Sequence, residues 1–214
     1  MAILNDGING GFTGKVGSVI GYQLNGKWII KALPKPSKKN KKGTDQQNKC
    51  RSKFSLIQSF LSRILDFIRV GFHLEAKSKG MSAHNAAKSY NMLHAFDEQG
   101  NIDYTKIRLC QGNLLPVENA SVKVNENGLL FQWDTQNGAG YIRADDQVML
   151  MAFDENINLA VRTVSGNRRR SGEHLLKIPP YGMGLRFHTW IAFVADNRES
   201  ISNSVYLGTI EYQV

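Results

Sequence analysis

The sequence has little cysteine and no long apolar run. Its two cysteines, Cys50 and Cys110, are 60 residues apart, and neither has a CxxC partner or a histidine close by. This spacing favours reduced, buried thiols over a disulfide framework or a zinc site. The N-terminus lacks the charged-then-apolar pattern of a secretory signal. We therefore expect no membrane segment, and synthesis and residence in the cytoplasm.

The sequence also lacks the common catalytic motifs. It contains no GxSxG elbow and no HExxH pair. The acidic pair of note, Asp145-Asp146, precedes a predicted strand. Neighbouring strand residues point to opposite faces, so this pair indicates a turn at the strand entry rather than a shared acid/base site. The histidines are scattered without metal-ligand spacing, at His73, His84, His94, His174 and His188. We predict that the protein is not an enzyme and holds no cofactor or metal.

Acidic residues are scarce in the first quarter of the chain. Residues 1–53 hold eleven Lys or Arg but only Asp6 and Asp45 as acids, which gives the whole net charge of +9. The remaining 161 residues carry sixteen basic and sixteen acidic side chains. An electrostatic partner is therefore expected to contact the N-terminal region.

The segment 18–33 has the pattern of a β-hairpin. The β-prone runs SVIGYQL and KWIIKAL flank Asn25-Gly26, the strongest two-residue signal for a type I′ turn. This turn pairs Leu24 with Lys27, Gln23 with Trp28, Tyr22 with Ile29 and Gly21 with Ile30. Both faces of the hairpin are apolar, and an isolated hairpin is marginal in water, so the chain itself or a neighbouring copy must cover it.

The glycines before this hairpin surround a GK pair, Gly14-Lys15. A phosphate-binding loop needs GxxxxGK[ST] followed by a helix, whereas Asn9 and Val16 occupy the key positions here and a strand follows. The glycines at positions 11, 14 and 17 instead indicate positive φ or close backbone approach. Gly21 is expected to make room beside Trp28.

Two basic clusters are candidate polyanion contacts. The linker after the hairpin contains Lys35, Lys38, Lys39, Lys41 and Lys42, which can neutralise phosphates while Tyr22 and Trp28 stack on bases. The alternative is a solvated linker that binds nothing. Arg168, Arg169 and Arg170 fall in a predicted loop, where they either clasp an anion or form solvated surface.

Residues 44–98 are predicted to form a helical hairpin. Thr44 and Gln47 form a capping box, and the apolar pattern that follows predicts one helix to about Val70, ~38 Å long. Its apolar arc covers about half the circumference, more than one packing surface needs. After a break at Gly71, Ser82 caps a second helix with Ala83, Ala86, Ala87, Tyr90 and Leu93 on one face. The candidate interface residues are Tyr22, Trp28, Ile30, Phe54, Phe60 and Phe67.

From residue 102 to 214 the hydrophobic period becomes two. Eight segments have this pattern: YTKIRL, ASVKV, GLLFQWD, QVMLMAF, LAVRTV, HLLKIP, FHTWIAFVA and SVYLGTIEYQV. Their spacing predicts an antiparallel β-sandwich of the immunoglobulin or fibronectin-III type. The predicted fold is therefore α+β and mostly β, with an arm at 1–43, a helical hairpin at 44–98 and a sandwich at 102–214.

Several motifs along the chain resemble one family. They are GKVGSVIGY, NGKWIIKALP, TDQQNKCRSKF, NAAKSY, FQWD, ADDQVMLMAF and SNSVYLG. On these motifs the chain resembles a family of Bacteroidota proteins, domain of unknown function 6266. In that family proline usually follows the helix-capping threonine, where this chain has Asp45, and both residues suit a first helical turn. The resemblance implies a bacterial source and supplies no catalytic residues.

Three functions fit these patterns. The first is a structural assembly or scaffold protein whose arm and long helix dock on other copies or another protein. The second is sequence-independent binding of nucleic acid by the basic arm. The third is a β-sandwich that binds a ligand or carbohydrate, since this fold hosts many functions.

Overall fold

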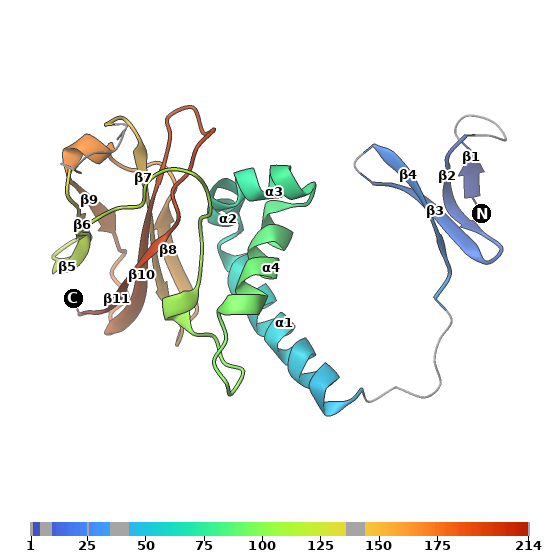
Figure 1. Ribbon diagram of the computed structural model, residues 1–214. Coiled ribbons are helices and arrows are strands. Elements are labelled where there is room, and N and C mark those ends of the chain that lie inside the picture. The colour runs from blue at the N-terminus through green and yellow to red at the C-terminus, as the bar shows by residue number, and fades with distance from the viewer. Residues whose placement is uncertain (1, 5–9, 25, 35–42, 136–143, 214) are drawn as a thin grey trace. The chain divides into compact units, whose positions relative to one another are not determined.

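The computed structural model describes residues 2–4, 10–24, 26–34, 43–135 and 144–213 (Figure 1). The chain forms two compact units, Met1–Asn48 and Lys49–Val214.

The first unit contains a four-stranded antiparallel meander rather than a lone hairpin (Figure 1). Its strands, in spatial order, are β1 (Ala2–Leu4), β2 (Phe12–Val16), β3 (Val19–Leu24) and β4 (Lys27–Ala32). The predicted pairing of β3 with β4 is confirmed at every position, from Leu24 opposite Lys27 to Gly21 opposite Ile30. Gly26 has a φ of 75°, as a primed hairpin turn requires.

Glycines let the strands of this sheet approach each other. A Cβ on Gly11 would overlap the Trp28 ring, and one on Gly21 would meet Phe12. The expectation that Gly21 makes room for Trp28 was therefore wrong, because Gly11 does so. Gly14 lies in β2 with a φ of 118° and is followed by Lys15 in the same strand. The GK pair is thus part of a sheet and not of a phosphate loop.

A bent series of helices follows, and the second unit begins within the first of them, at Lys49. They are α1 (Asp45–Arg63), α2 (Leu65–Gly71) and α3 (His73–Lys79). The capping box is confirmed, since the Thr44 N–H donates to Gln47 Oε1 at 3.1 Å and the Gln47 N–H donates to Thr44 Oγ1 at 3.3 Å.

The expected single helix to Val70 was wrong, because the backbone leaves helical geometry at Ile64 and again at Phe72. Both side chains are completely buried in the core that α1 and α2 share. Bending at these residues lets successive helices pack into one core, which accounts for an apolar arc wider than one straight helix needs.

Helix α4 (Ala83–His94) lies beside α2 and α3 (Figure 1). Its predicted cap is confirmed, because Ser82 Oγ accepts a hydrogen bond from the Asn85 N–H at 3.2 Å. Ala86 and Ala87 are buried as expected, but Leu93 is 78% exposed. The buried face instead includes Asn91, which is completely buried.

Seven strands follow, in two antiparallel sheets. They are β5 (Ser121–Asn125), β6 (Gly128–Gln132), β7 (Gln147–Asp154), β8 (Leu159–Thr163), β9 (Glu173–Lys177), β10 (Leu185–Val194) and β11 (Val205–Tyr212). One sheet has the order β11-β10-β7-β8 and the other β5-β6-β9.

Seven of the eight predicted strand segments contain a strand. The exception is YTKIRL, where a 3₁₀ turn, η1 (Tyr104–Lys106), leads into irregular backbone. Asp103 caps this turn by accepting from the Thr105 N–H at 3.1 Å. A side-chain cap thus favours a turn over an extended strand at this point.

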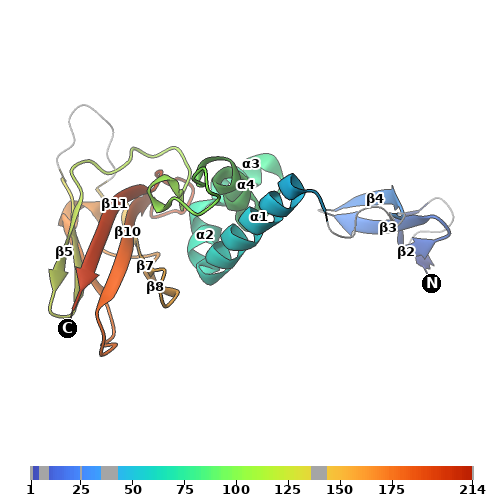
Figure 2. The same ribbon diagram turned by 90° about the horizontal axis from the view of Figure 1, so that it is seen from below.

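The second unit is built in layers around the four-stranded sheet (Figure 2). Met149, Met151 and Phe153 of β7 belong to a core shared with the helices. The alternate residues Val148, Leu150 and Ala152 belong to a core shared with the β5-β6-β9 sheet. The unit is therefore a mixed fold of helices and antiparallel sheets with more strand than helix. It contains residues 49–98 of the expected helical segment and all of the segment 102–214.

Gly71 offers a test of how α2 packs on the rest of the unit. A Cβ there would collide with the Leu109 carbonyl oxygen and approach Cys110. We expect Gly71→Ala to lower the free energy of unfolding by about 1–3 kcal/mol, the usual cost of overpacking. Urea denaturation measures this. The control, Gly184→Ala, adds a Cβ 3.5 Å from the flexible Gln213 side chain, and an equal loss in both variants would contradict the tight contact.

Candidate functional site

The N-terminal sheet has two chemically different faces. The strand register places Phe12, Val16, Val19, Gln23, Trp28, Ile30 and Ala32 on one side, here called the uncharged face. The opposite side, here called the lysine face, carries Thr13, Lys15, Ile20, Tyr22, Leu24, Lys27, Ile29 and Lys31. The hairpin 18–33 was expected to be apolar on both faces, and its two lysines, Lys27 and Lys31, correct that expectation for one of them.

This sheet encloses no core of its own. Of the described residues from Gly10 to Pro34, Gly21 alone is buried. On the uncharged face Trp28 is 39% exposed and Ile30 is 63% exposed. On the lysine face Tyr22 is half-buried, and Lys31 Nζ lies 5.7 Å from its ring centroid. The apolar residues expected at an interface are therefore open to a partner here.

The other three interface candidates lie in the second unit. Phe60 and Phe67 are core residues, and Phe60 packs edge-on against Phe153 with ring centroids 4.9 Å apart. Phe54 is 48% exposed and carries Lys88 Nζ 4.4 Å from its ring centroid. Phe54 alone of these three therefore remains available at the surface.

The lysines of the linker, Lys35, Lys38, Lys39, Lys41 and Lys42, lie outside the described residues. Their role as polyanion contacts stays a prediction.

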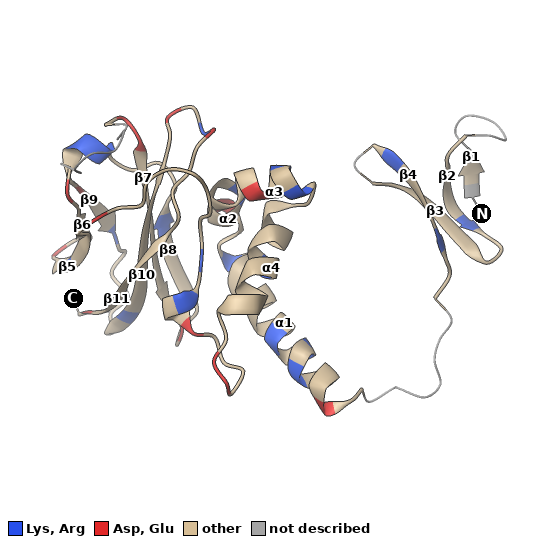
Figure 3. Ribbon diagram, viewed as in Figure 1, with Lys and Arg blue, Asp and Glu red and all other residues tan. Residues whose placement is uncertain are grey.

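The three arginines at 168–170 form a basic stretch of the ribbon (Figure 3), and two of them pair with an acidic residue of the chain itself. Asp145 Oδ1 pairs with Arg168 at 2.7 Å and with Arg170 at 3.2 Å. Arg169 is buried, with its guanidinium 4.0 Å from the Phe193 ring centroid and a hydrogen bond to the Leu115 carbonyl at 2.9 Å. The turn η2 (Arg169–Ser171) is thus held against the turn that precedes β7. Arg168 and Arg170 keep exposed side chains, and the role of the three arginines as polyanion contacts stays a prediction.

The two cysteines have different environments. Cys110 is buried, and burial raises the pKa of its thiol, which keeps it protonated and inert. Cys50 was also expected to be buried, but it is exposed near the start of α1. Among the described residues no group of three or more His, Cys, Asp or Glu side chains is arranged to hold a metal ion. No described helix is long and apolar enough to span a membrane.

The sequence patterns did not reveal a polar cavity of about 330 Å³ in the second unit. Its lining comes from α4, from the segment around η1 and from the start of β11: Tyr90, His94, Thr105, Lys106, Ile107, Arg108, Ser204 and Tyr206. Basic and hydroxyl side chains dominate this list. Because the three segments are distant in sequence, no local motif marks the cavity.

Asn91 holds one wall of the cavity in place. Its side-chain oxygen accepts from the Arg108 N–H, and its Nδ2 donates to the Arg108 carbonyl, both at 2.9 Å. Nδ2 also donates to the Ala87 carbonyl in α4 at 2.9 Å. Asn91 therefore gives the backbone at Arg108 the pair of hydrogen bonds that a neighbouring strand would otherwise supply.

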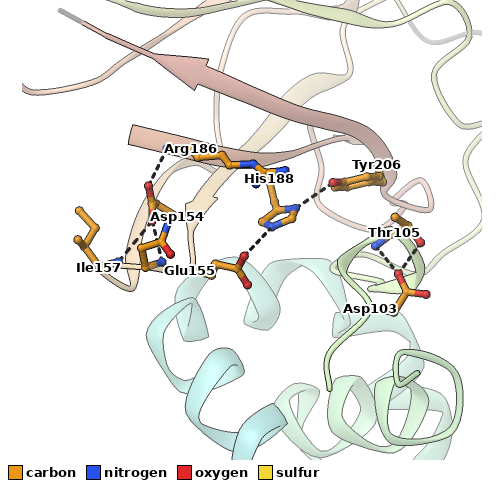
Figure 4. Close-up of polar contacts among 9 residues, drawn as sticks. Asp103, Thr105, Asp154, Glu155, Ile157, Arg186, His188 and Tyr206 are labelled. Atoms are coloured by element: carbon orange, nitrogen blue, oxygen red, sulfur yellow. Dashed lines mark hydrogen bonds and ion pairs between the residues drawn. The ribbon is translucent and has the colours of Figure 1, made fainter. Parts of the chain in front are cut away.

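His188 contacts both Tyr206 and Glu155 (Figure 4). The Tyr206 hydroxyl is 2.9 Å from His188 Nδ1, Tyr104 stacks on the imidazole with centroids 4.1 Å apart, and Glu155 lies 3.9 Å from Nε2. Burial lowers the pKa of His188, although Glu155 opposes the effect. Burial raises the pKa of Tyr206, and burial together with Glu155 raises that of Tyr104 to about 12.

The Tyr206 hydroxyl stays protonated at neutral pH, because burial raises its pKa. Its hydrogen bond with His188 Nδ1 holds Tyr206 in place as one wall of the cavity.

Comparison with protein families gives one match. The model of a family of unknown function, DUF6266, matches residues 11–208. The chain belongs to this family. Searches of curated proteins and of solved structures give no match.

The Asn91 clamp predicts a specific loss of stability. Replacing Asn91 by leucine removes its hydrogen bonds and leaves the buried Arg108 backbone groups without these partners. We expect Asn91→Leu to lower the free energy of unfolding by about 2–4 kcal/mol. Thermal and urea unfolding measure this, with Asn85→Leu on the exposed side of α4 as the control. Equal stability of the two variants would show that the clamp contributes nothing.

Proposed function

We propose that this member of the DUF6266 family is a non-enzymatic assembly protein whose N-terminal sheet docks, through its uncharged face, onto a second copy of the chain. The observation that carries the proposal is the separation of charge between the two faces of that sheet. On the lysine face Lys15, Lys27 and Lys31 stand among the apolar residues, and on the uncharged face the described side chains include no charge.

The apolar face of the N-terminal sheet has no cover in its own unit. A sheet must bury such a face against another element to be stable, and this one encloses no core of its own. Trp28, Ile30 and Val16 are 39%, 63% and 51% exposed, so covering them would contribute that fraction of the roughly 1.5–3 kcal/mol that full burial of a large apolar side chain gives. Docking therefore stabilises the arm that performs it.

The charge pattern favours the uncharged face as the contact between two copies. Two copies that met through their lysine faces would bring six ammonium groups together, and like charges in an interface are strongly unfavourable. Two uncharged faces are complementary to each other without any such cost. A two-fold axis through the sheet would bury the same residues of both copies, so a second copy is the occupant that the charge pattern favours.

We also infer that the two sheets of the second unit form a sandwich of the immunoglobulin or fibronectin-III kind, which acts as a platform for the arm. Antiparallel sheets of three and four strands with a common core support this inference. Phe54, exposed on α1, is a further candidate contact for a partner.

The proposal predicts the effect of a charge on each face. Ile30→Lys places an ammonium on the uncharged face, and Leu24→Lys places the same group on the lysine face. We expect the full-length protein and Leu24→Lys to have the mass of a dimer or larger assembly, and Ile30→Lys to have that of a monomer. Light scattering of the purified full chain over a dilution series measures this.

A monomeric wild-type protein at every concentration would refute self-association. Assembly that persists unchanged in Ile30→Lys would refute the uncharged face as its site. A wild-type monomer that gains mass only with another protein present would assign the face to that partner instead.

A second candidate function is sequence-independent binding of nucleic acid by the lysine face. Lys15 and Lys31 flank Ile20 in one row across β2, β3 and β4, and Lys31 lies over Tyr22. Clustered ammonium groups beside an aromatic ring suit phosphates and stacked bases. This surface stays open when the uncharged face is covered, so the two functions are compatible.

Salt dependence tests this second function. Each phosphate contact contributes about 0.9 to the slope of log affinity against log salt on duplex DNA. We expect Lys15→Gln, Lys27→Gln and Lys31→Gln together to reduce that slope by nearly three. Fluorescence polarisation with a labelled duplex measures it, with Lys77→Gln, Lys79→Gln and Lys123→Gln as the matched control. Absence of binding by the wild-type protein at about 50 mM salt would remove this candidate.

A further inference from the structure

We propose that the polar cavity between α4, η1 and β11 binds a small molecule through an oxyanion group, a phosphate or carboxylate, with Arg108 as the principal contact. The cavity is lined entirely by residues of the second unit. The proposal is therefore independent of the self-association proposed for the N-terminal sheet.

Arg108 is held in position by Tyr90 and Asn91. Its guanidinium carbon lies 4.6 Å from the Tyr90 ring centroid, a cation–π contact that holds the group beside the ring. Among the described residues no carboxylate lies within 4.0 Å of it. Its backbone is held on both sides by Asn91. Arg108 is thus pre-organised for a planar, two-oxygen contact.

Other donors come from Ser204 and His94. Ser204 Oγ accepts from the Leu109 N–H at 2.9 Å, which leaves its own O–H to donate into the cavity. His94 packs against Tyr90 with centroids 4.6 Å apart and offers a ring N–H. These groups come from different segments of the chain, and both are among the side chains that line the same cavity.

The charge balance of the cavity favours an anion. Lys106 Nζ is paired with Asp103 at 2.8 Å, so this pair is neutral overall, and the charge of Arg108 is left over. A bound oxyanion would neutralise it. The Tyr206 hydroxyl is hydrogen-bonded to His188 Nδ1, and Tyr206 borders the site.

The size of the cavity limits the ligand. A volume of about 330 Å³ is at the small end of ligand pockets, which range from roughly 300 to 1,000 Å³. This volume suits one oxyanion group and a short body rather than a dinucleotide. The ligand class is therefore a small phosphorylated or carboxylated molecule.

Inorganic phosphate and acetate are the probes that test this site in the full-length protein. Each probe is compared with sodium chloride at matched ionic strength. We expect at least one of the two to raise the unfolding temperature of the protein beyond the effect of chloride, as a ligand of the folded state does. Arg108→Gln should weaken binding by about tenfold or more, the loss expected for a charge-assisted contact. Arg63→Gln, an exposed arginine on α1, should bind like the wild type. Phosphate acting alone would assign a phosphate ligand, and acetate acting alone a carboxylate.

A second measurement keeps the test decisive if Arg108→Gln unfolds. In ¹H–¹⁵N spectra of the wild-type protein, the Nε–H signal of Arg108 should shift on titration with the active probe. An unmoved Arg108 signal, an equal thermal response in Arg108→Gln, or no response beyond chloride would each overturn the proposal.

Discussion

A sheet that is apolar on both faces must be covered on both sides, and the second unit is arranged around this requirement. The strands β7 and β10 are buried almost throughout. Alternate residues of β7 point to two separate cores, one filled by the helices and the other by the β5-β6-β9 sheet. The helices must cover one face of this single sheet (Figure 2). This requirement accounts for the bends at Ile64 and Phe72 and for the position of α4.

The same requirement is unmet within the N-terminal sheet. Its uncharged face exposes Trp28 and Ile30, whereas the opposite face carries lysines that keep it compatible with water. Among the described residues, this face is an apolar sheet surface without a cover in its own unit. The proposed assembly role rests on that surface, and the proposed polyanion contact rests on the lysine face.

Sequence reasoning succeeded where the signal was local. The register from Gly21 to Ile30 and the caps at Thr44 and Ser82 depend on neighbouring residues, and each was predicted correctly. It failed where distant residues decide. Asn91 replaces a strand partner for the segment that was expected to be a strand, and Arg169 is buried under Phe193. The cavity joins three segments that are distant in sequence. The wide apolar arc of the helices suggested an interface for Phe60 and Phe67, because the sequence did not show that the β11-β10-β7-β8 sheet covers them.

Collisional quenching of tryptophan fluorescence tests the central claim most directly, because Trp28 lies on the uncharged face whereas Trp133 and Trp190 are buried, at 6% and 0% exposure. Quenching by a soluble quencher therefore reports mainly on Trp28. The account predicts that Trp28 is shielded in full-length protein of dimer or larger mass and becomes accessible in Ile30→Lys. Free quenching of Trp28 in the wild-type protein, or shielding in a sample with the mass of one chain, would contradict it.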